Sequence, residues 1–447
     1  MNKSITFLSE IDNLFNKNIP QDVILRARES FIDYLAVTCA GAEFNKEKIK
    51  NYLNCIPLES GDYTVINCKR KLPIKEAVFL NGLNSHALDY DDGTNAGIIH
   101  LGAPIFSILI SLAEYRDVEF LEFLKCAIIG YEVSFTLANS IQPKHKLMGY
   151  HATGTCGIIG ATIAACYFLK FSQEEMFNSF GAACVSSSGM LKVLDGKSEL
   201  KPLNVAKSAM LALNCVQLGK SGFRGPDDSL GGRGFLKMMG GSENINIRPF
   251  KEGGIFSIMK TYTKPYASCR YTHPAIEAVI FLRNKYNIKI EDIREIEVST
   301  YSLAVSGHDH TDIKGVSSGK MSIPYSVAIG FVKGKVDLEE FQEHEMNNID
   351  VINLTKKVKV SIDDYYTTVF PQKQGAKVEI KTLDGAYVKS VDFPKGEPEN
   401  PLSEVEFMNR YNSLMKYSKV SSDNFSLVYN RIKEDNVSVK EILGFLE

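Results

Sequence analysis

Several features that mark other classes of protein are missing from this chain of 447 residues. The formal net charge is only -2, so no overall field attracts nucleic acid or an anionic membrane, and an anionic ligand must be held by local cations. The first residues, MNKSITFLSEIDNLFNK, lack the unbroken apolar core of a signal peptide. The longest apolar run, APIFSILISLAEY, is too short to span a bilayer. We therefore predict a cytoplasmic protein with no nucleic-acid or membrane partner.

Paired cysteine motifs are also absent. The nine cysteines are scattered, mostly within apolar segments, and none forms a CxxC pair. This pattern indicates reduced thiols rather than disulfides or a zinc site.

Helical spacing of apolar residues dominates the chain from about residue 20 to residue 260. In IPQDVILRARESFIDYLAV, Pro20 is expected in the first helical turn, and Ile24, Ala27, Phe31 and Leu35 fall on one stripe. Later stretches, such as TGTCGIIGATIAACYFLKF, are rich in alanine and glycine and apolar on all sides. Such helices are typical of a closely packed interior, so this part predicts one large all-α domain.

The pattern changes after about residue 288. The stretches IREIEVST, KKVKVSI and AKVEIKTLDGAYVKSVDF alternate with period two, and Asp384-Gly385 is a typical hairpin turn. The segment PKGEPENP then interrupts regular structure, and the remaining residues again have helical spacing. We predict a mainly α protein, with an all-α domain of residues 1–262 and 403–447 and a smaller α+β lid of residues 263–402.

The segment HALDYDDGTNAGIIHLGAP gathers three aspartates and two histidines. The preceding helix is expected to end near Asp91 and Asp92, where the macrodipole disfavours acidic groups. One interpretation is a solvated loop in which His86 is a satisfied, partly buried histidine. The other is that Asp89 and His100 face a cleft and share a proton-transfer task.

Three further positions carry candidate chemistry. His151 precedes a segment that opens an apolar helix, where a lowered pKa suits a neutral base; capping or packing is the alternative. Lys201, before the rigid Pro202, is either solvated or a clamp for a carboxylate. Arg270 and His273 precede another helix and together suit a substrate carboxylate and a proton donor.

Taken in order, these segments resemble the MmgE/PrpD family over nearly the whole chain. The markers are HALDYDDG followed by His100, GYHATGTCGIIGA, SGMLKVLDGKSELKPLN, KPYASCRYTHPAIEA and GKMSIPYSVA. The resemblance implies a helical domain and an α+β lid with the active site between them, usually in a homodimer, and catalysis without a metal or cofactor. It places the functional positions at Asp89, His100, His151, Lys201 and His273.

The chain departs from the pattern of this family at several positions. Family members commonly have His-Pro where this chain has His100-Leu101, and many have a histidine in place of Asn204. A threonine used by the decarboxylase-like members is Gly93 here, and the citrate-type dehydratases have Asn-Asp-Thr at this motif. These differences leave the substrate open.

The resemblance implies removal of a proton beside a carboxylate of a small polycarboxylic acid. We predict a metal-independent lyase similar to 2-methylcitrate dehydratase, with an epimerase of the iminodisuccinate type or a cis-aconitate decarboxylase as alternatives. In this hypothesis Lys201 and Arg270 hold substrate carboxylates, His151 is the base, and His100 or His273 is the acid.

Asp89 is expected to orient an imidazole or to bind a substrate hydroxyl. Lys320 or Tyr325 is expected to contribute to substrate binding from the lid. Rival hypotheses are a metal-dependent phosphohydrolase that uses His86, Asp89 and Asp92 as ligands, and a non-catalytic binding protein.

Overall fold

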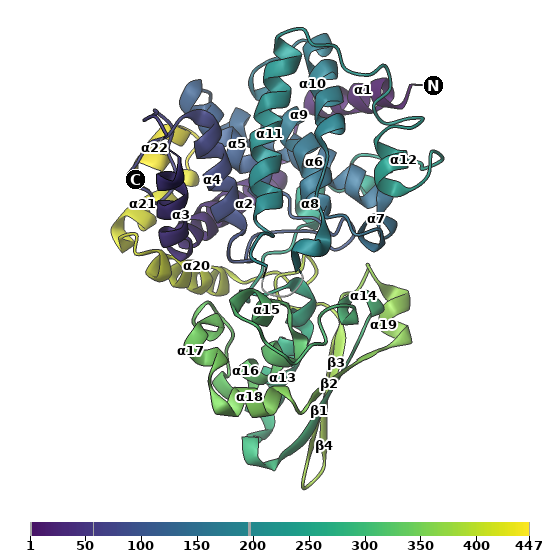
Figure 1. The fold of residues 1–447 in the computed structure, drawn as a ribbon, viewed down its shortest axis with the longest axis vertical. Helices are drawn as coiled ribbons and strands as arrows, with labels where there is room; N and C mark the ends of the chain where they lie inside the picture. Colours follow the sequence, from purple (N-terminus) through teal and green to yellow (C-terminus); the bar gives the residue numbers. More distant parts are fainter. Residues whose placement is uncertain (1, 57, 195–197, 447) are drawn as a thin grey trace.

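The computed structural model describes residues 2–56, 58–194 and 198–446. These residues form a helical bundle and a smaller α+β lid beneath it (Figure 1). The mainly α fold with a smaller α+β part, predicted from the sequence, is confirmed. The main helices of the bundle are α1 (Lys3–Phe15), α2 (Gln21–Phe44), α3 (Lys46–Cys55), α4 (Ile74–His86), α5 (Gly102–Tyr115), α6 (Phe120–Ile141), α9 (Gly157–Phe168), α10 (Gln173–Ser186) and α11 (Leu203–Lys220).

The interior of the bundle is as closely packed as the alanine- and glycine-rich stretches predicted. Helices α6 and α9 meet at Gly130 and Gly160, where a Cβ on Gly160 would lie 2.4 Å from the Gly130 carbonyl oxygen. Any larger residue at Gly160 would push the two helices apart. Three short helices, α7 (Lys144–Leu147), α8 (Ala152–Thr155) and α12 (Phe235–Gly240), lie in the connections.

Two helix boundaries differ from the sequence-based expectation. Pro20 is the N-cap residue of α2 rather than a residue of its first turn, although the predicted stripe is buried. Helix α4 ends at His86, before the aspartates, because the chain turns at Asp89 into the left-handed region with φ of 51°. The aspartates therefore belong to an irregular loop after the helix and not to its last turn.

The lid is built on one four-stranded sheet of order β2-β1-β3-β4. Strand β1 (Ile293–Thr300) pairs in parallel with β2 (Val358–Ile362) and antiparallel with β3 (Ala376–Thr382), which pairs antiparallel with β4 (Ala386–Val391). The predicted turn at Asp384-Gly385 joins β3 to β4. The helices of the lid are α13 (His273–Tyr286), α14 (Ser302–Val305), α15 (Val316–Met321), α16 (Ile323–Lys333), α17 (Glu343–Met346), α18 (Ile349–Thr355) and α19 (Asp364–Val369).

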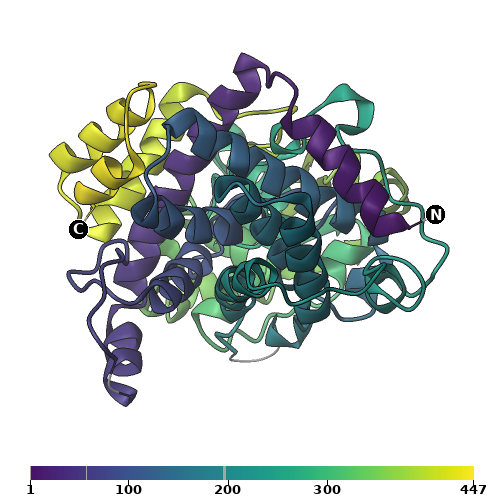
Figure 2. The ribbon, with the colours of Figure 1, turned by 90° about the horizontal axis from the view of Figure 1, so that it is seen from above.

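The last helices return to the bundle. Helices α20 (Glu404–Ser418), α21 (Ser422–Ile432) and α22 (Val439–Gly444) gather at one side of it, away from the N-terminus (Figures 1 and 2). Helix α20 packs along α2, and its Arg410 forms a buried ion pair with Asp33. The same guanidinium donates to the carbonyl oxygens of Tyr90 at 2.8 Å and Lys264 at 2.6 Å. One side chain therefore joins α2, the loop with the aspartates and the segment that leads into the lid.

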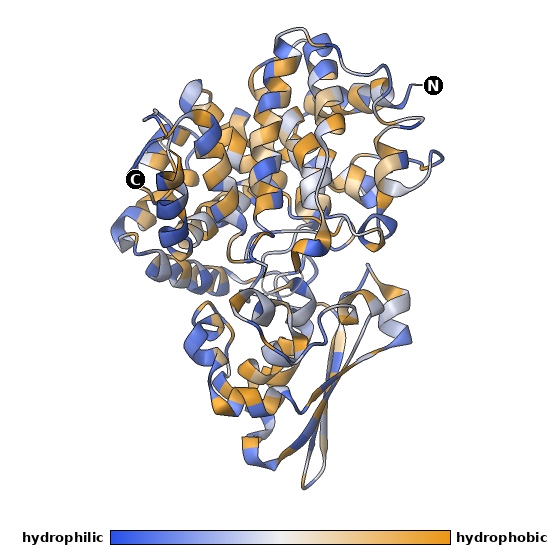
Figure 3. Ribbon diagram, in the orientation of Figure 1, coloured by the Kyte–Doolittle hydropathy of each residue, from blue (hydrophilic) through white to orange (hydrophobic). Residues whose placement is uncertain are grey.

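Hydropathy follows this arrangement (Figure 3). The peripheral helices α3 and α20 are largely hydrophilic, whereas the lid helix α16 is largely hydrophobic. Among the helices in the described part of the chain, none combines the length and the apolar character needed to cross a membrane.

The buried ion pair predicts a large stability difference between two arginine variants. Arg410→Met leaves the Asp33 carboxyl buried without its partner, so the free energy of unfolding should fall by about 3–5 kcal/mol. Arg431→Met, which removes ion pairs on the surface, is the matched control and should lower it by a small fraction of that. Urea denaturation followed by circular dichroism measures both; equal losses would contradict this account of Arg410.

Candidate functional site

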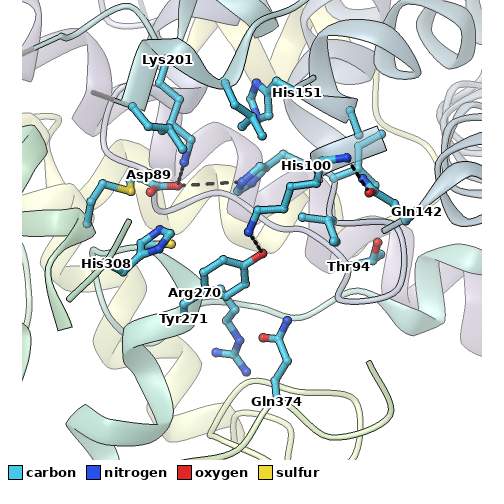
Figure 4. Close-up of a pocket in the computed structure, with 18 of the residues that line it drawn as sticks. Asp89, Thr94, His100, Gln142, His151, Lys201, Arg270, Tyr271, His308 and Gln374 are labelled. Atoms are coloured by element: carbon cyan, nitrogen blue, oxygen red, sulfur yellow. Dashed lines mark hydrogen bonds and ion pairs between the residues drawn. The ribbon is translucent and has the colours of Figure 1, made fainter. Parts of the chain in front are cut away.

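A small cavity of about 80 Å³ lies between the bundle and the lid (Figure 4). Three residues of the SGMLKVLDGKSELKPLN motif, 195–197, lie outside the described residues. The polar residues that line the cavity are Asp89, Thr94, His100, Gln142, Lys146, Tyr150, His151, Lys201, Tyr262, Lys264, Cys269, Arg270, Tyr271, His308 and Gln374. Ligand sites for drug-sized molecules are several times larger, so the occupant of this cavity must be small.

The buried carboxylate of Asp89 is the electrostatic centre of the cavity. Its Oδ1 accepts from the ammonium groups of Lys201 and Lys264, each at 2.8 Å, and Lys264 also donates to the Asp89 carbonyl oxygen at 2.6 Å. Burial alone would raise the pKa of Asp89, but the two ammonium groups hold it well below its usual value. The two ammonium groups carry two positive charges and Asp89 carries one negative charge. Together the three groups keep one net positive charge, which attracts an anionic ligand.

His100 stands next to this group and is held by two acceptors. Its Nδ1 lies 2.8 Å from the Asp92 carbonyl oxygen and 3.1 Å from the Asp91 carboxylate, and its Nε2 lies 3.9 Å from Asp89 Oδ1. His86 also binds Asp91 through Nδ1, at 2.8 Å. Burial alone would raise the pKa of Asp91, but His100 and His86 lower it, so Asp91 is ionised and orients both rings.

His151 occupies the position before α8 and lines the cavity opposite His100. The ring centroids of the two histidines are 6.5 Å apart. The pKa of His151 is lowered well below its usual value, in the direction expected from the sequence. The cause is different from the one expected: burial contributes most and the Lys201 charge follows, whereas α8 has only four residues. The ring is therefore neutral at pH 7.

Arg270 and His273 have different surroundings from those expected. Arg270 lines the cavity, but its N–H groups donate to Glu397, to the carbonyl oxygens of Pro394 and Lys395, and to His273 Nδ1. His273 is fully buried, is not among the lining residues, and also contacts the Ser268 carbonyl oxygen through Nε2 at 3.2 Å. Arg270 therefore fastens the irregular segment PKGEPENP to the start of α13, and His273 supports Arg270.

The two lid residues predicted to bind substrate also lie away from the lining of this cavity. Lys320 donates to the carbonyl oxygen of Leu88 at 2.8 Å and so supports the loop that carries Asp89. Tyr325 is buried in α16, and its hydroxyl donates to the Glu340 carbonyl oxygen at 2.8 Å. A role of Lys320 or Tyr325 in substrate binding stays a prediction.

Several lining residues escaped the sequence-based selection, namely Gln142, Lys146, Tyr262, Lys264, Tyr271, His308 and Gln374. Lys264 is the first residue of the segment KPYASCRYTHPAIEA. Its position close to Arg270 in the sequence could have marked it as a candidate site residue. His308 stands in a His-Asp-His run, which no local pattern connects with the other residues of the cavity. Burial lowers the pKa of Lys146 to about 8, and its Nζ donates to the Tyr271 hydroxyl at 2.7 Å.

The loop also gathers potential metal ligands. Among the described residues, ligand atoms of His86, Asp89, Asp91 and His100 all lie within 4.8 Å of one another. Asp89 Oδ1, the Asp91 carboxylate and Nδ1 of both imidazoles already take part in hydrogen bonds or ion pairs, whereas His86 Nε2 and Asp89 Oδ2 are buried without a hydrogen-bond partner in the described part of the chain. The third ligand of the metal hypothesis, Asp92, instead accepts from the Tyr131 hydroxyl at 2.6 Å and from the Gly102 N–H at 3.0 Å. This geometry suits a hydrogen-bonded network better than a cation site.

Tyr262 fills the space beside Gly93. A Cβ on Gly93 would lie 2.4 Å from the Tyr262 hydroxyl oxygen and 2.9 Å from the Ile99 carbonyl oxygen. The tyrosine hydroxyl thus occupies the place that a side chain at position 93 would take. Its ring lies under the Arg270 guanidinium, 4.8 Å from ring centroid to Cζ.

This contact predicts strong coupling between the two positions. Gly93→Thr alone should destabilise the protein by about 1–3 kcal/mol, because it overpacks a rigid site. Tyr262→Val should recover part of that loss in the double variant, because it removes the colliding ring. Thermal unfolding of the wild type, both single variants and the double variant gives the coupling energy. Additive losses would contradict the predicted collision.

Comparison with known proteins agrees with this architecture. The model of the MmgE/PrpD N-terminal domain matches residues 9–248, and that of the MmgE/PrpD C-terminal domain matches residues 266–428. A cis-aconitate decarboxylase of Aspergillus terreus is 24% identical over 433 residues, which cover 90% of this chain and 87% of the relative. A cis-aconitate decarboxylase-like protein of Aspergillus oryzae is also 24% identical and covers 98% of this chain and 95% of the relative. The mouse cis-aconitate decarboxylase is 21% identical, covering 92% and 86%.

These relatives support a lyase-type activity, and the two domain models together span most of the chain. The protein belongs to the MmgE/PrpD family.

Proposed function

We propose that this protein is a lyase that acts on a small tricarboxylic acid of the cis-aconitate type. The observation that carries the proposal is the cavity that Lys146, Lys201 and Lys264 line together with two buried histidines, His100 and His151. The relatives named as cis-aconitate decarboxylases make loss of CO₂ the first candidate reaction.

The charges of the cavity suit such a substrate. Lys201 and Lys264 remain net positive after pairing with Asp89, and Lys146 adds a third ammonium group from the α7 side. A carboxylate that displaces water from these groups gains charge-assisted hydrogen bonds in a site largely shielded from solvent. Binding is therefore assigned to the lysines, with Tyr262 as a neutral donor, rather than to Arg270.

The chemistry needs stabilisation of negative charge more than it needs a strong base. In decarboxylation the bond between carbon and the leaving carboxylate breaks, and its electron pair passes into the neighbouring conjugated carboxylate as the double bond shifts. CO₂ leaves as that bond breaks, and one proton then adds to the carbon next to the conjugated carboxylate, so the double bond ends at the carbon that lost CO₂. Fixed ammonium groups lower the energy of the intermediate anion because they are already oriented when its charge develops. His100 and His151 are the candidate groups for the proton step.

Dehydration of a hydroxytricarboxylic acid, as in 2-methylcitrate dehydratase, is the second candidate. Two imidazoles on opposite sides of one cavity match the acid and the base that elimination of water requires. This chain also has Gly93 where the decarboxylase-like members of the family have a threonine, and this difference counts against decarboxylation.

Proton NMR in heavy water tests the proposal with cis-aconitate, citrate, 2-methylcitrate and iminodisuccinate as substrates. A decarboxylated product that carries deuterium at carbon, formed equally with and without EDTA, is expected. His100→Gln and His151→Gln should each lower kcat by about 10²-fold or more. An alkene product from citrate or 2-methylcitrate would select dehydration, and no turnover of any of these acids would contradict the proposed function. Loss of activity with EDTA would favour the metal hypothesis.

Lys146 predicts how activity depends on pH. Its ammonium is charged below its pKa of about 8 and loses the charge as the pH rises through that value, so kcat/KM should fall above pH 8. Lys146→Arg keeps the charge and should remove this fall, whereas Lys146→Met should lower kcat/KM by about tenfold or more already at pH 7. If Lys146→Arg showed the same fall of kcat/KM near pH 8, the fall would come from the titration of another group.

A further inference from the structure

The cavity histidines differ in which ring nitrogen carries the proton, and the hydrogen bonds at these nitrogens show which one it is. His100 Nδ1 faces the Asp92 carbonyl oxygen at 2.8 Å, and His308 Nδ1 faces the Ser306 carbonyl oxygen at 2.9 Å. A carbonyl oxygen only accepts hydrogen bonds, so Nδ1 carries the proton in both rings. In the neutral form their Nε2 atoms are therefore acceptors.

In His151 the other ring nitrogen carries the proton. Its Nδ1 lies 3.1 Å from Nδ2 of Asn204, in the first turn of α11, and both residues are buried. An amide nitrogen only donates, so Nδ1 of His151 must accept. The same Nδ2 also donates to the Met190 carbonyl oxygen at 3.3 Å, which fixes the orientation of the amide. The proton of the neutral ring is then on Nε2, away from α11.

This arrangement decides what His151 offers to a ligand. Burial and the Lys201 charge keep the ring neutral, so it carries one N–H and that N–H is on the free side of the ring. A neutral imidazole that donates to an oxygen polarises it without transferring a proton, and such a donor works best where the developing charge is an oxyanion. A base requires a lone pair at the same place, which this tautomer does not have.

We propose that Asn204 is a positioning residue that locks His151 as the Nε2–H tautomer, so that His151 donates a hydrogen bond to the substrate rather than acting as the base. His100 then remains as the proton carrier, because the Asp92 carbonyl oxygen and the Asp91 carboxylate hold its Nδ1 and leave its Nε2 as the acceptor. This role deepens the proposed function and rests on it, whereas the tautomer itself is a property of the protein without substrate.

Long-range ¹H–¹⁵N correlation NMR of protein labelled at histidine tests the tautomer directly, and His151→Gln assigns the signal. At pH 7 we expect His151 to carry its proton on Nε2, with His100 and His308 as internal references that carry it on Nδ1. A proton on Nδ1 of His151, or a mixture of both tautomers, would overturn the proposal. Because no substrate is present, failure of the proposed reaction leaves this result unaffected.

Two substitutions then separate positioning from packing. Asn204→Asp replaces the donor by an acceptor and should move the His151 proton to Nδ1, with kcat lowered by about 10²-fold or more and KM little changed. Asn204→Leu removes the donor and should give mixed tautomers and a similar loss of kcat.

The matched control is Asn81→Leu, which removes another buried amide that is bonded to the backbone of Thr64 and Ile66, away from the lining of the cavity. It should lower the unfolding temperature while the His151 tautomer and kcat stay as in the wild type. An Asn204→Asp protein with wild-type kcat would overturn the positioning role.

Discussion

A single buried carboxylate constrains this molecule more than any other group. Asp89 has left water and retains its charge only because Lys201, at the start of α11, and Lys264, at the entrance to the lid, reach it from opposite parts of the chain. A buried charge without partners would cost several kcal/mol, so the bundle, the lid and the loop must meet at this point. The contact among the bundle, the lid and the loop forms the cavity and gives it its net positive charge.

The sequence predicted those parts of the fold that depend on local pattern. The helical stripe of α2 and the hairpin at Asp384-Gly385 need only residues that are close in the chain. The acidic loop was recognisable as a site for a similar reason, because Asp89 and His100 are eleven residues apart in one unusual cluster. The cluster made the loop a candidate, and the resemblance to the MmgE/PrpD family favoured the functional interpretation over a solvated loop.

Other site residues depended on contacts that no local pattern shows. Arg270 was the natural choice for binding a carboxylate, but its donors are used by Glu397 and by the backbone of a segment more than a hundred residues away. Lys264, six residues earlier, lines the same cavity and pairs with Asp89. Likewise, the protonated nitrogen of His151 is set by Asn204, which lies 53 residues further along the chain. Tertiary hydrogen bonds, rather than residue types, decide these roles.

Arg410 determines when the loop that carries Asp89 can be fixed during synthesis of the chain. Its guanidinium supports the carbonyl of Tyr90, next to Asp89, although the two residues are 320 positions apart. At translation rates of about 5–20 residues per second, the loop waits roughly 16–64 s for α20 to be synthesised. While residues 91 to 410 are synthesised, the nascent chain carries the loop without the clamp that fixes it. The loop that carries Asp89 is therefore fixed only after α20 has packed along α2.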